Sequence, residues 1–170
     1  MLMDEYRSPW RTPEVEQFQE TARRFWTAEL IPHVERWEAQ GHIDRGVWKR
    51  LGEMGFLLAD LPSGYGGGDG DYAHLAALVE TSAACGFGPG FGPHYIVGHY
   101  LHHYGSEAQK RRWLPGMASG DIVASIGMSE PGAGSDLQGI RTRARRDGEH
   151  YVICLLYTSP SPRDQRGSRM

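Results

Sequence analysis

The chain has 170 residues and a formal net charge of −3. This mildly acidic balance argues against non-specific binding to nucleic acid or to a membrane surface. No apolar run approaches the roughly 18 residues that a membrane-spanning helix needs, and the length suggests about one domain.

The first helix is predicted to begin after Thr12, because Thr12 followed by Pro13 is typical of an N-cap and a first helical position. Apolar residues then recur at helical spacing and define one face, namely Val15, Phe18, Ala22, Phe25 and Trp26. Pro32 should kink or end this helix, because its backbone cannot donate a hydrogen bond. The apolar stripe resumes at Trp37 and runs toward Gly41.

Four more helices are predicted before residue 120. Asp44 and Asp71 are placed to cap two of them. Another begins near Pro93 and ends by Gly105, and residues 106–109 have the form of a capping box that opens the last. The residues expected on inner faces are Val47, Trp48, Leu51 and Met54 after Asp44, and Leu75, Leu78, Val79 and Ser82 after Asp71.

The pattern changes after residue 120. Residues 122–128 are a continuous apolar run of the length of a buried strand. In residues 140–145, Ile, Thr and Ala alternate with Arg, which is typical of a half-buried strand. Asp147 and Gly148 form a strong two-residue hairpin signal, so a returning strand is expected from Tyr151.

The predicted fold class is therefore α+β. An all-α helical bundle over residues 1–120 is followed by the truncated start of an antiparallel β-domain over residues 121–153. Residues 154–170 are rich in Ser, Pro and Arg and lose all hydrophobic period after Tyr157, so they predict no element. This tail is similar to translated sequencing read-through, and a disordered natural tail is the alternative.

Cysteine usage and the N-terminus bear on location. Cys154 lies in the atypical tail, which leaves Cys85 without an internal disulfide partner, as in a reducing compartment. The first residues lack the basic-then-apolar pattern of a signal peptide. A cytoplasmic location is expected.

Residues 129–136, Ser-Glu-Pro-Gly-Ala-Gly-Ser-Asp, are the most informative stretch of the chain. Pro131 fixes its own φ, and Gly132 and Gly134 allow φ > 0 and let backbone approach a ligand without an intervening Cβ. Ser135 and the flanking polar residues add hydrogen-bonding groups. The pattern predicts a rigid polar lip after a strand.

Extended on both sides, this stretch resembles the acyl-CoA dehydrogenase family. The matching segments are residues 126–139 and 141–148, with residues 51–57, 65–67, 105–110 and 113–115 upstream. Residues 88–91 and 136–140 are most similar to the long-chain branch of the family. The resemblance covers roughly residues 14 to 153.

The resemblance implies a flavin site that binds FAD. It places the backbone of Met128 and Ser129 against the pyrimidine end of the ring, and Ser135 against both the cofactor and the pantetheine arm of the substrate. The full set of implied cofactor-binding residues is Ile126, Gly127, Met128, Ser129, Gly132, Ala133, Gly134 and Ser135. Glu130 is expected to hold the amides of the turn.

The resemblance also implies a reaction, in which a fatty acyl-CoA is oxidised to the trans-2-enoyl-CoA. A carboxylate removes the α-proton, and electrons pass on to an electron-transfer flavoprotein or a similar acceptor. The family's base belongs to a C-terminal helical domain, so no catalytic residue is assigned in this chain, and the fragment is expected to be inactive. Relatives are usually homotetramers.

Two further segments acquire roles by the same resemblance. The glycines of residues 86–92 lie near the acyl end of the substrate cavity, where Gly90 would leave room for a long chain. Arg141, Arg143, Arg145 and Arg146 are most simply the solvated face of a strand, and a contact to the CoA phosphates is the alternative.

Other residues suggest competing interpretations. His99, His102 and His103 share one helix at spacings that could bind a metal, yet no carboxylate or Cys joins them at matching spacing, so no metal site is assigned. The glycines of residues 65–70 lack a P-loop ending and predict a turn. The functional alternatives to a dehydrogenase are a non-enzymatic helical binding module and a non-functional assembly chimera.

Overall fold

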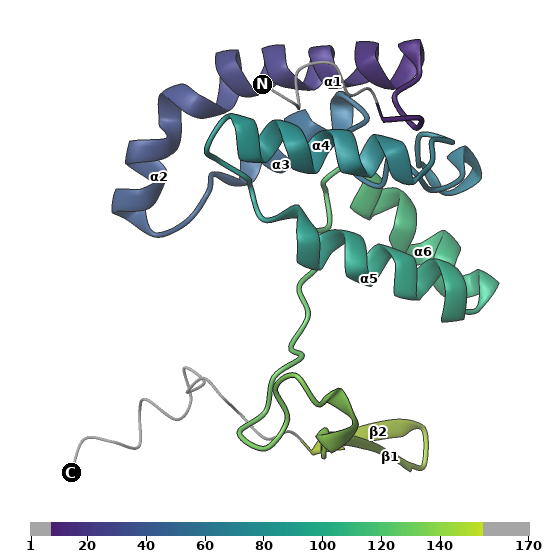
Figure 1. Cartoon of the computed structure of the whole chain (residues 1–170). Helices are drawn as coiled ribbons and strands as arrows, with labels where there is room; N and C mark the ends of the chain where they lie inside the picture. Colours follow the sequence, from purple (N-terminus) through teal and green to yellow (C-terminus); the bar gives the residue numbers. More distant parts are fainter. Residues whose placement is uncertain (1–7, 155–170) are drawn as a thin grey trace. The chain divides into compact units, whose positions relative to one another are not determined.

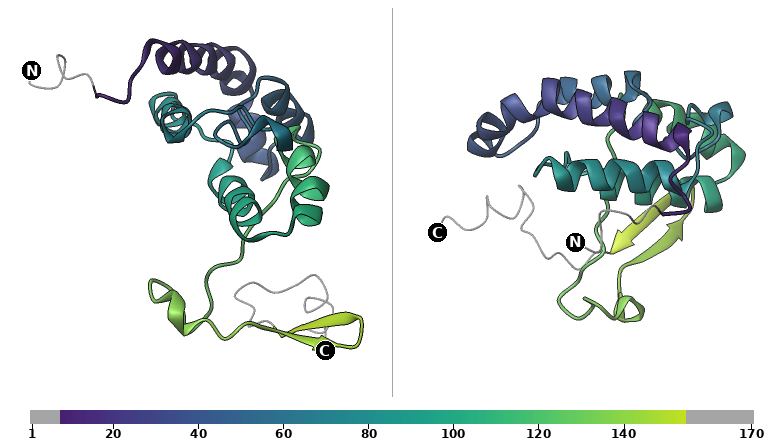
Figure 2. Two further views of the ribbon diagram at one scale, coloured as in Figure 1. Left: turned by 90° about the vertical axis from the view of Figure 1, so that its right-hand side faces the viewer. Right: turned by 45° about the horizontal axis from the view of Figure 1, so that its top comes forward.

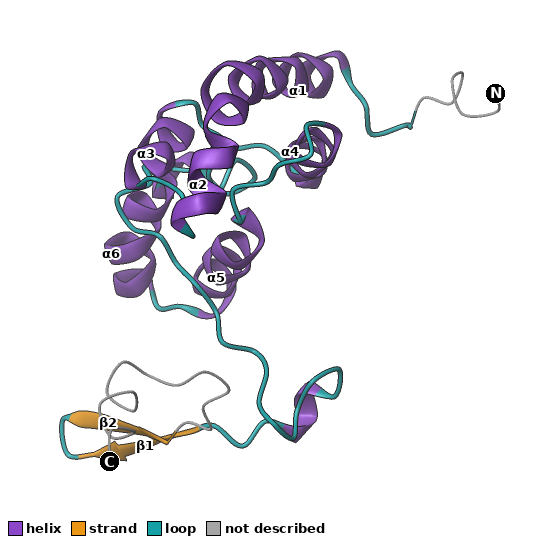
Figure 3. Cartoon of the chain, turned by 90° about the vertical axis from the view of Figure 1, so that its left-hand side faces the viewer, coloured by secondary structure: helices purple, strands orange, loops and turns teal. Residues whose placement is uncertain are grey.

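The computed structural model describes residues 8–154 (Figure 1). It divides into two compact units, one ending at Ile126 and the other beginning at Gly127. The first unit is helical and the second contains a two-stranded antiparallel sheet (Figure 3). The predicted α+β class is therefore confirmed.

Within the described residues, the helical unit contains six α-helices. They are α1 (Pro13–Phe25), α2 (Val34–Gln40), α3 (Arg45–Glu53), α4 (Tyr72–Ala84), α5 (Phe91–Tyr104) and α6 (Glu107–Ala118). α1 packs along α4, and α5 packs along α6 (Figures 1 and 2). None of the helices in the described residues is long and apolar enough to cross a membrane.

Helix starts follow the capping signals in the sequence. The Thr12 side chain accepts a hydrogen bond from the Val15 amide, and Asp71 and Ser106 each open a helix with a complete capping box. Asp44 departs from the prediction. It stands at the N-cap position of α3, but its carboxylate makes no capping bond and instead accepts from Arg36, because a charged donor competes well for a carboxylate.

Proline breaks the N-terminal helix as predicted. The chain passes from α1 through a π-helical turn (Trp26–Leu30) and a 3-10 turn (Ile31–His33) before α2 begins. Pro32 lies within the 3-10 turn, and α2 ends at Gly41, whose φ is +75°. The left-handed conformation explains why glycine stands there.

The core of the helical unit is built around Trp26. Its ring meets those of Phe25, Phe56 and Phe91 at centroid distances of 5.5–6.0 Å, and its indole N–H donates to the Phe87 carbonyl over 3.0 Å. Burying an aromatic or aliphatic side chain of this size contributes roughly 1.5–3 kcal/mol. The indole bond removes the cost of a buried donor without a partner.

The inner face of α4 differs from the prediction. Leu78 is fully buried, but Val79 is 56% exposed, and Leu75 and Ser82 are half-buried. The buried residues of the helix are Ala73, Ala77, Leu78 and Thr81. Ala73 and Ala77 form a buried cluster with Val15 of α1, and Val79 lies outside this buried face.

The second unit contains β1 (Arg143–Asp147) and β2 (His150–Cys154), joined by residues 148–149. The hairpin forms one residue later than Asp147 and Gly148 suggested, with Gly148 at φ +61°. Cys154 pairs with Arg143, so the predicted tail begins one residue too early. Residues 155–170 lie outside the described residues.

Two strand predictions are wrong. Residues 122–128 are extended but pair with no other described segment, and β1 is exposed along its whole length rather than half-buried. Both predictions assumed a sheet that would cover and pair these residues. A strand exists only with a partner, and the described residues supply one partner strand, β2.

Replacing Gly52 by alanine should destabilise the helical unit. A Cβ at Gly52 of α3 would lie 2.4 Å from the backbone of Ser119 at the end of α6. The overpacking should cost about 1–3 kcal/mol of unfolding free energy, measured by urea denaturation of the 170-residue chain.

Gly46, on the same helix, provides the matched control. A Cβ there meets nothing within 4 Å, so Gly46→Ala should leave stability unchanged or raise it by up to about 1 kcal/mol. Equal effects of the two substitutions would contradict the close approach of α3 and α6.

Candidate functional site

The turn at residues 129–136 is closed by backbone hydrogen bonds. Glu130 and Ala133 exchange both of their backbone bonds, each over 3.0 Å, and Ala133 is buried. The Asp136 carboxylate then accepts from the Gln138 amide over 3.1 Å and opens a short 3-10 turn (Leu137–Gly139). The motif therefore has a definite conformation built from local bonds.

Glu130 fastens the turn to the start of the hairpin. Its carboxylate accepts from the amides of Arg141 and Thr142, each over 2.8 Å, and from the Thr142 hydroxyl. The Thr142 hydroxyl, followed by the Arg141 amide, holds the pKa of Glu130 below its usual value. These amides belong to the two residues that precede β1 and not to the turn itself. The sequence-based expectation that Glu130 holds the amides of the turn is therefore wrong.

The glycines of the motif do not adopt the left-handed backbone conformation. Gly132 and Gly134 do not have positive φ, contrary to the prediction. A Cβ added at Gly127, Gly132 or Gly134 would meet nothing within 4 Å, whereas one at Gly139 would lie 3.0 Å from the Gly132 carbonyl. The conformation of the described residues thus leaves little room for a side chain at Gly139, whereas the backbones of the other three glycines are bare.

The residues around these glycines offer polar groups to solvent. Ser129, Gly132, Gly134 and Ser135 are exposed, and Ile126 and Met128 are half-buried. Bare backbone beside two exposed hydroxyls is suited to a ligand that needs close approach and several hydrogen bonds. The sequence-predicted residues 126–135 are therefore contiguous and accessible, although Ala133 itself is buried.

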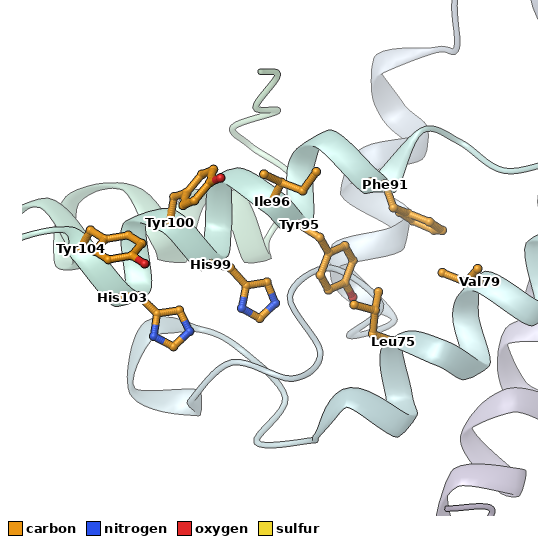
Figure 4. A pocket seen from close by; sticks show the side chains of 10 residues that line it. Leu75, Val79, Phe91, Tyr95, Ile96, His99, Tyr100, His103 and Tyr104 are labelled. Atoms are coloured by element: carbon orange, nitrogen blue, oxygen red, sulfur yellow. The ribbon is translucent and has the colours of Figure 1, made fainter. Parts of the chain in front are cut away.

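An apolar groove of about 420 Å³ lies between α4 and α5 (Figure 4). Its lining residues are Leu75 and Val79 from α4, and Phe91, Gly92, Tyr95, Ile96, His99, Tyr100, His103 and Tyr104 from α5. Val79 and Tyr104 are 56% and 81% exposed. Large apolar surface left open to water is typical of a binding surface.

The glycines at the start of α5 have different reasons to be there. Gly90, the N-cap, has φ +79°, so its backbone conformation itself favours glycine. Gly92 lines the groove, has no positive φ, and a Cβ there would meet nothing within 4 Å. Gly92 is thus the residue whose lack of a side chain shapes the groove, a distinction that the sequence does not reveal.

The histidines of α5 meet a carboxylate that sequence spacing missed. His99 Nε2 lies 3.0 Å from Asp60 Oδ2, and the Asp60 side chain is only 7% exposed. The His99 and His103 rings stack at 6.0 Å. Asp60 precedes His99 by 39 residues, so no helical period could have paired them.

The His102 ring is placed differently from its neighbours. Burial, followed by the charge of His103, lowers the pKa of His102. Its Nδ1 has no hydrogen-bond partner among the described residues. Within residues 8–154, no three His, Cys, Asp or Glu side chains come together as a set of metal ligands.

The glycines of residues 65–70 form a packed turn between the 3-10 turn at Ser63–Tyr65 and α4. A Cβ at Gly67 would lie 2.1 Å from the Leu61 carbonyl, and one at Gly68 would lie 2.6 Å from the Ala59 carbonyl. Close backbone packing therefore accounts for these glycines, as the turn interpretation predicted.

The arginines of the hairpin face solvent. Arg143, Arg145 and Arg146 are exposed, and Arg145 lies 3.8 Å from Asp147. Arg146 Nε donates to the Gly148 carbonyl over 3.1 Å. The arrangement is that of a solvated strand surface that retains free positive charge.

Comparisons with known proteins agree with this architecture. Residues 12–121 match the model of the acyl-CoA dehydrogenase N-terminal domain. The long-chain specific mitochondrial acyl-CoA dehydrogenase of Sus scrofa is 41% identical over 138 residues, which are 80% of this chain and 32% of that protein. The chain thus spans about a third of the length of this curated relative.

Solved structures give the same result. An acyl-CoA dehydrogenase from Geobacillus kaustophilus superimposes with a TM-score of 0.79 at 36% identity, covering 86% of this chain and 39% of that one. A glutaryl-CoA dehydrogenase from Mycobacterium smegmatis in complex with FADH2 superimposes with a TM-score of 0.78 at 30% identity, covering 89% and 39%.

Proposed function

The chain belongs to the acyl-CoA dehydrogenase family, and on that premise we propose that residues 126–135 bind the flavin of an FAD-dependent acyl-CoA dehydrogenase. The reaction is the oxidation of a fatty acyl-CoA to the trans-2-enoyl-CoA. The observation that carries the proposal concerns Gly127, Gly132 and Gly134. The conformation of the described residues does not itself require glycine at these three positions, and their backbone is bare.

The residues of the turn fit FAD by their chemistry. Exposed glycine backbone lets a flat ring and a pyrophosphate come within hydrogen-bond distance of amides. In the proposed site the backbone of Met128 and Ser129 binds the pyrimidine edge, and Ser135 lies between cofactor and acyl thioester. FAD, when bound, supplies the acceptor for the hydride from the β-carbon.

The proton-abstracting base is proposed to lie outside these 170 residues. The motif has two carboxylates: Asp136 accepts from the Gln138 amide, and Glu130 is held as an anion by three hydrogen bonds from Arg141 and Thr142. A carboxylate with a lowered pKa is a weak base, and its oxygens are already engaged. Glu130 is therefore a structural anchor of the turn.

The groove between α4 and α5 is proposed to take the acyl chain. Its apolar lining suits a hydrocarbon, and α5 runs about 20 Å from Phe91 to Tyr104 at 1.5 Å per residue, enough for a long chain. We also propose that electrons leave to an electron-transfer flavoprotein or a similar acceptor, and that the complete protein is a homotetramer.

The flavin proposal is tested by Gly134→Ala in a chimera that carries residues 12–153 in place of the matching segment of the Sus scrofa enzyme. The added Cβ should weaken FAD binding at least about tenfold, equivalent to about 1.4 kcal/mol, because it obstructs close approach to the backbone. Binding is measured by titrating FAD into the deflavinated protein, and the melting temperature of that apoprotein should stay unchanged.

Gly139→Ala distinguishes a binding role from a folding role. A Cβ there would press on the Gly132 carbonyl at 3.0 Å, so this variant should lower the melting temperature of the apoprotein. If Gly134→Ala left FAD affinity unchanged while the chimera remained folded, the turn would not be the flavin site.

The acyl-groove proposal predicts that Gly92→Leu shifts chain-length preference. A side chain in the groove should lower kcat/KM for long-chain acyl-CoA about tenfold or more relative to short-chain acyl-CoA. Both rates are measured by dye reduction in the same chimera. Gly46→Leu, outside the groove, is the control, and parallel loss for both chain lengths would contradict the assignment.

The placement of the base predicts that the 170-residue chain alone does not oxidise acyl-CoA. Purified chain, supplied with FAD and long- or short-chain acyl-CoA, should leave a dye acceptor oxidised. The unsubstituted chimera is the positive control. Dye reduction by the chain alone would show that the base lies within it.

A further inference from the structure

His94 of α5 is fully buried, and both of its ring nitrogens meet backbone groups. Nε2 lies 3.1 Å from the Met117 carbonyl of α6, and Nδ1 lies 3.3 Å from the Ala124 amide nitrogen. A carbonyl can only accept and an amide N–H can only donate. The ring is therefore neutral, with its proton on Nε2 and a lone pair on Nδ1.

The surroundings of His94 favour this neutral form. Burial lowers the pKa of His94, the bond to the Met117 carbonyl opposes that effect, and the charge of Arg45 on α3 adds to it. The other ring packed against it is Trp48, at 5.4 Å. No carboxylate among the described residues pairs with this imidazole.

The Ala124 bond is the last hydrogen bond that the described helical unit makes to the chain before the turn at residues 129–136. The preceding bond joins the Ile122 amide to the Gly116 carbonyl over 2.8 Å. Val123 is 39% exposed, whereas Ile122 and Ala124 pack against the core. Ala124 is thus the last residue before the turn that a hydrogen bond ties to the described helical unit.

We propose that His94 is a positioning residue, a proton-controlled latch that holds residues 122–126 against the helical unit only while its Nδ1 is unprotonated. Protonation at Nδ1 would turn the acceptor of the Ala124 bond into a second donor and open that bond. This latch stands on the geometry of His94 alone.

The direction of the pH dependence follows from the lowered pKa. The latch should be closed above the ordinary histidine value of about 6.5 and should open as the pH falls through the lower folded-state value. Opening should reduce the hydrogen-exchange protection of the Ala124 amide at least about fivefold, the equivalent of about 1 kcal/mol for one hydrogen bond.

The test uses the 170-residue chain and NMR. At pH 8, nitrogen chemical shifts of the His94 ring should show the proton on Nε2, and acidification to pH 5 should lower protection at Ala124 but not at Ile122. His94→Gln should abolish this pH dependence, whereas His103→Gln, at an exposed site on the same helix, should preserve it.

The outcomes separate the latch from the flavin site. A proton on Nδ1 at pH 8, or unchanged protection of Ala124 at a pH where the ring shifts show His94 protonated, would overturn the latch. Both measurements use the unsubstituted chain, so they decide the matter even if His94→Gln does not fold. Neither involves FAD, so loss of the flavin proposal would leave the latch standing.

Discussion

The helical unit depends on a segment that is buried without being helical. Residues 56–61 run through the interior, and their backbone groups need partners there because water cannot reach them. The Tyr95 hydroxyl of α5 donates to the Phe56 carbonyl over 2.7 Å and accepts from the Ala59 amide over 3.3 Å. Leu58 takes φ +52° within this segment, so one ring stabilises backbone that carries local strain.

This arrangement fixes α5 relative to the rest of the unit. A Cβ at Gly98 would lie 2.5 Å from the Leu58 side chain, so α5 approaches the buried segment closely where glycine permits it. His99 then contacts Asp60 one turn away from Tyr95. Three residues of α5, Tyr95, Gly98 and His99, thus contact the same buried segment, and Tyr95 and His99 also line the groove.

Local signals could be predicted from the sequence, and long-range ones could not. Thr12 and Ser106 cap helices because the bond partners lie within three residues. Val79 is exposed although its helical spacing matches the inner face, and the contact of His99 with Asp60 depends on a residue 39 positions away. The strand expected at residues 122–128 failed for the same reason, since a strand is specified by its partner.

The candidate site shows the same division more sharply. Sequence resemblance pointed to residues 126–135 as the candidate site, but it could not tell which glycines the local backbone conformation needs. The structure separates Gly139, which meets backbone at 3.0 Å, from Gly132 and Gly134, which meet nothing. It likewise separates Gly90, whose φ is positive, from Gly92, which lines the groove. A glycine that the local conformation does not need is the better candidate for contact with a ligand.

One helix therefore carries two functions on different faces. The groove lies along residues such as Gly92 and Ile96, whereas His94 points into the interior, and Tyr95 lines the groove while its hydroxyl bonds backbone groups inside. A change in the position of α5 would alter the groove and the bond to Ala124 together, because the helix is a rigid element. The proposed acyl groove and the bond that holds Ala124 are in this way set by the same helix.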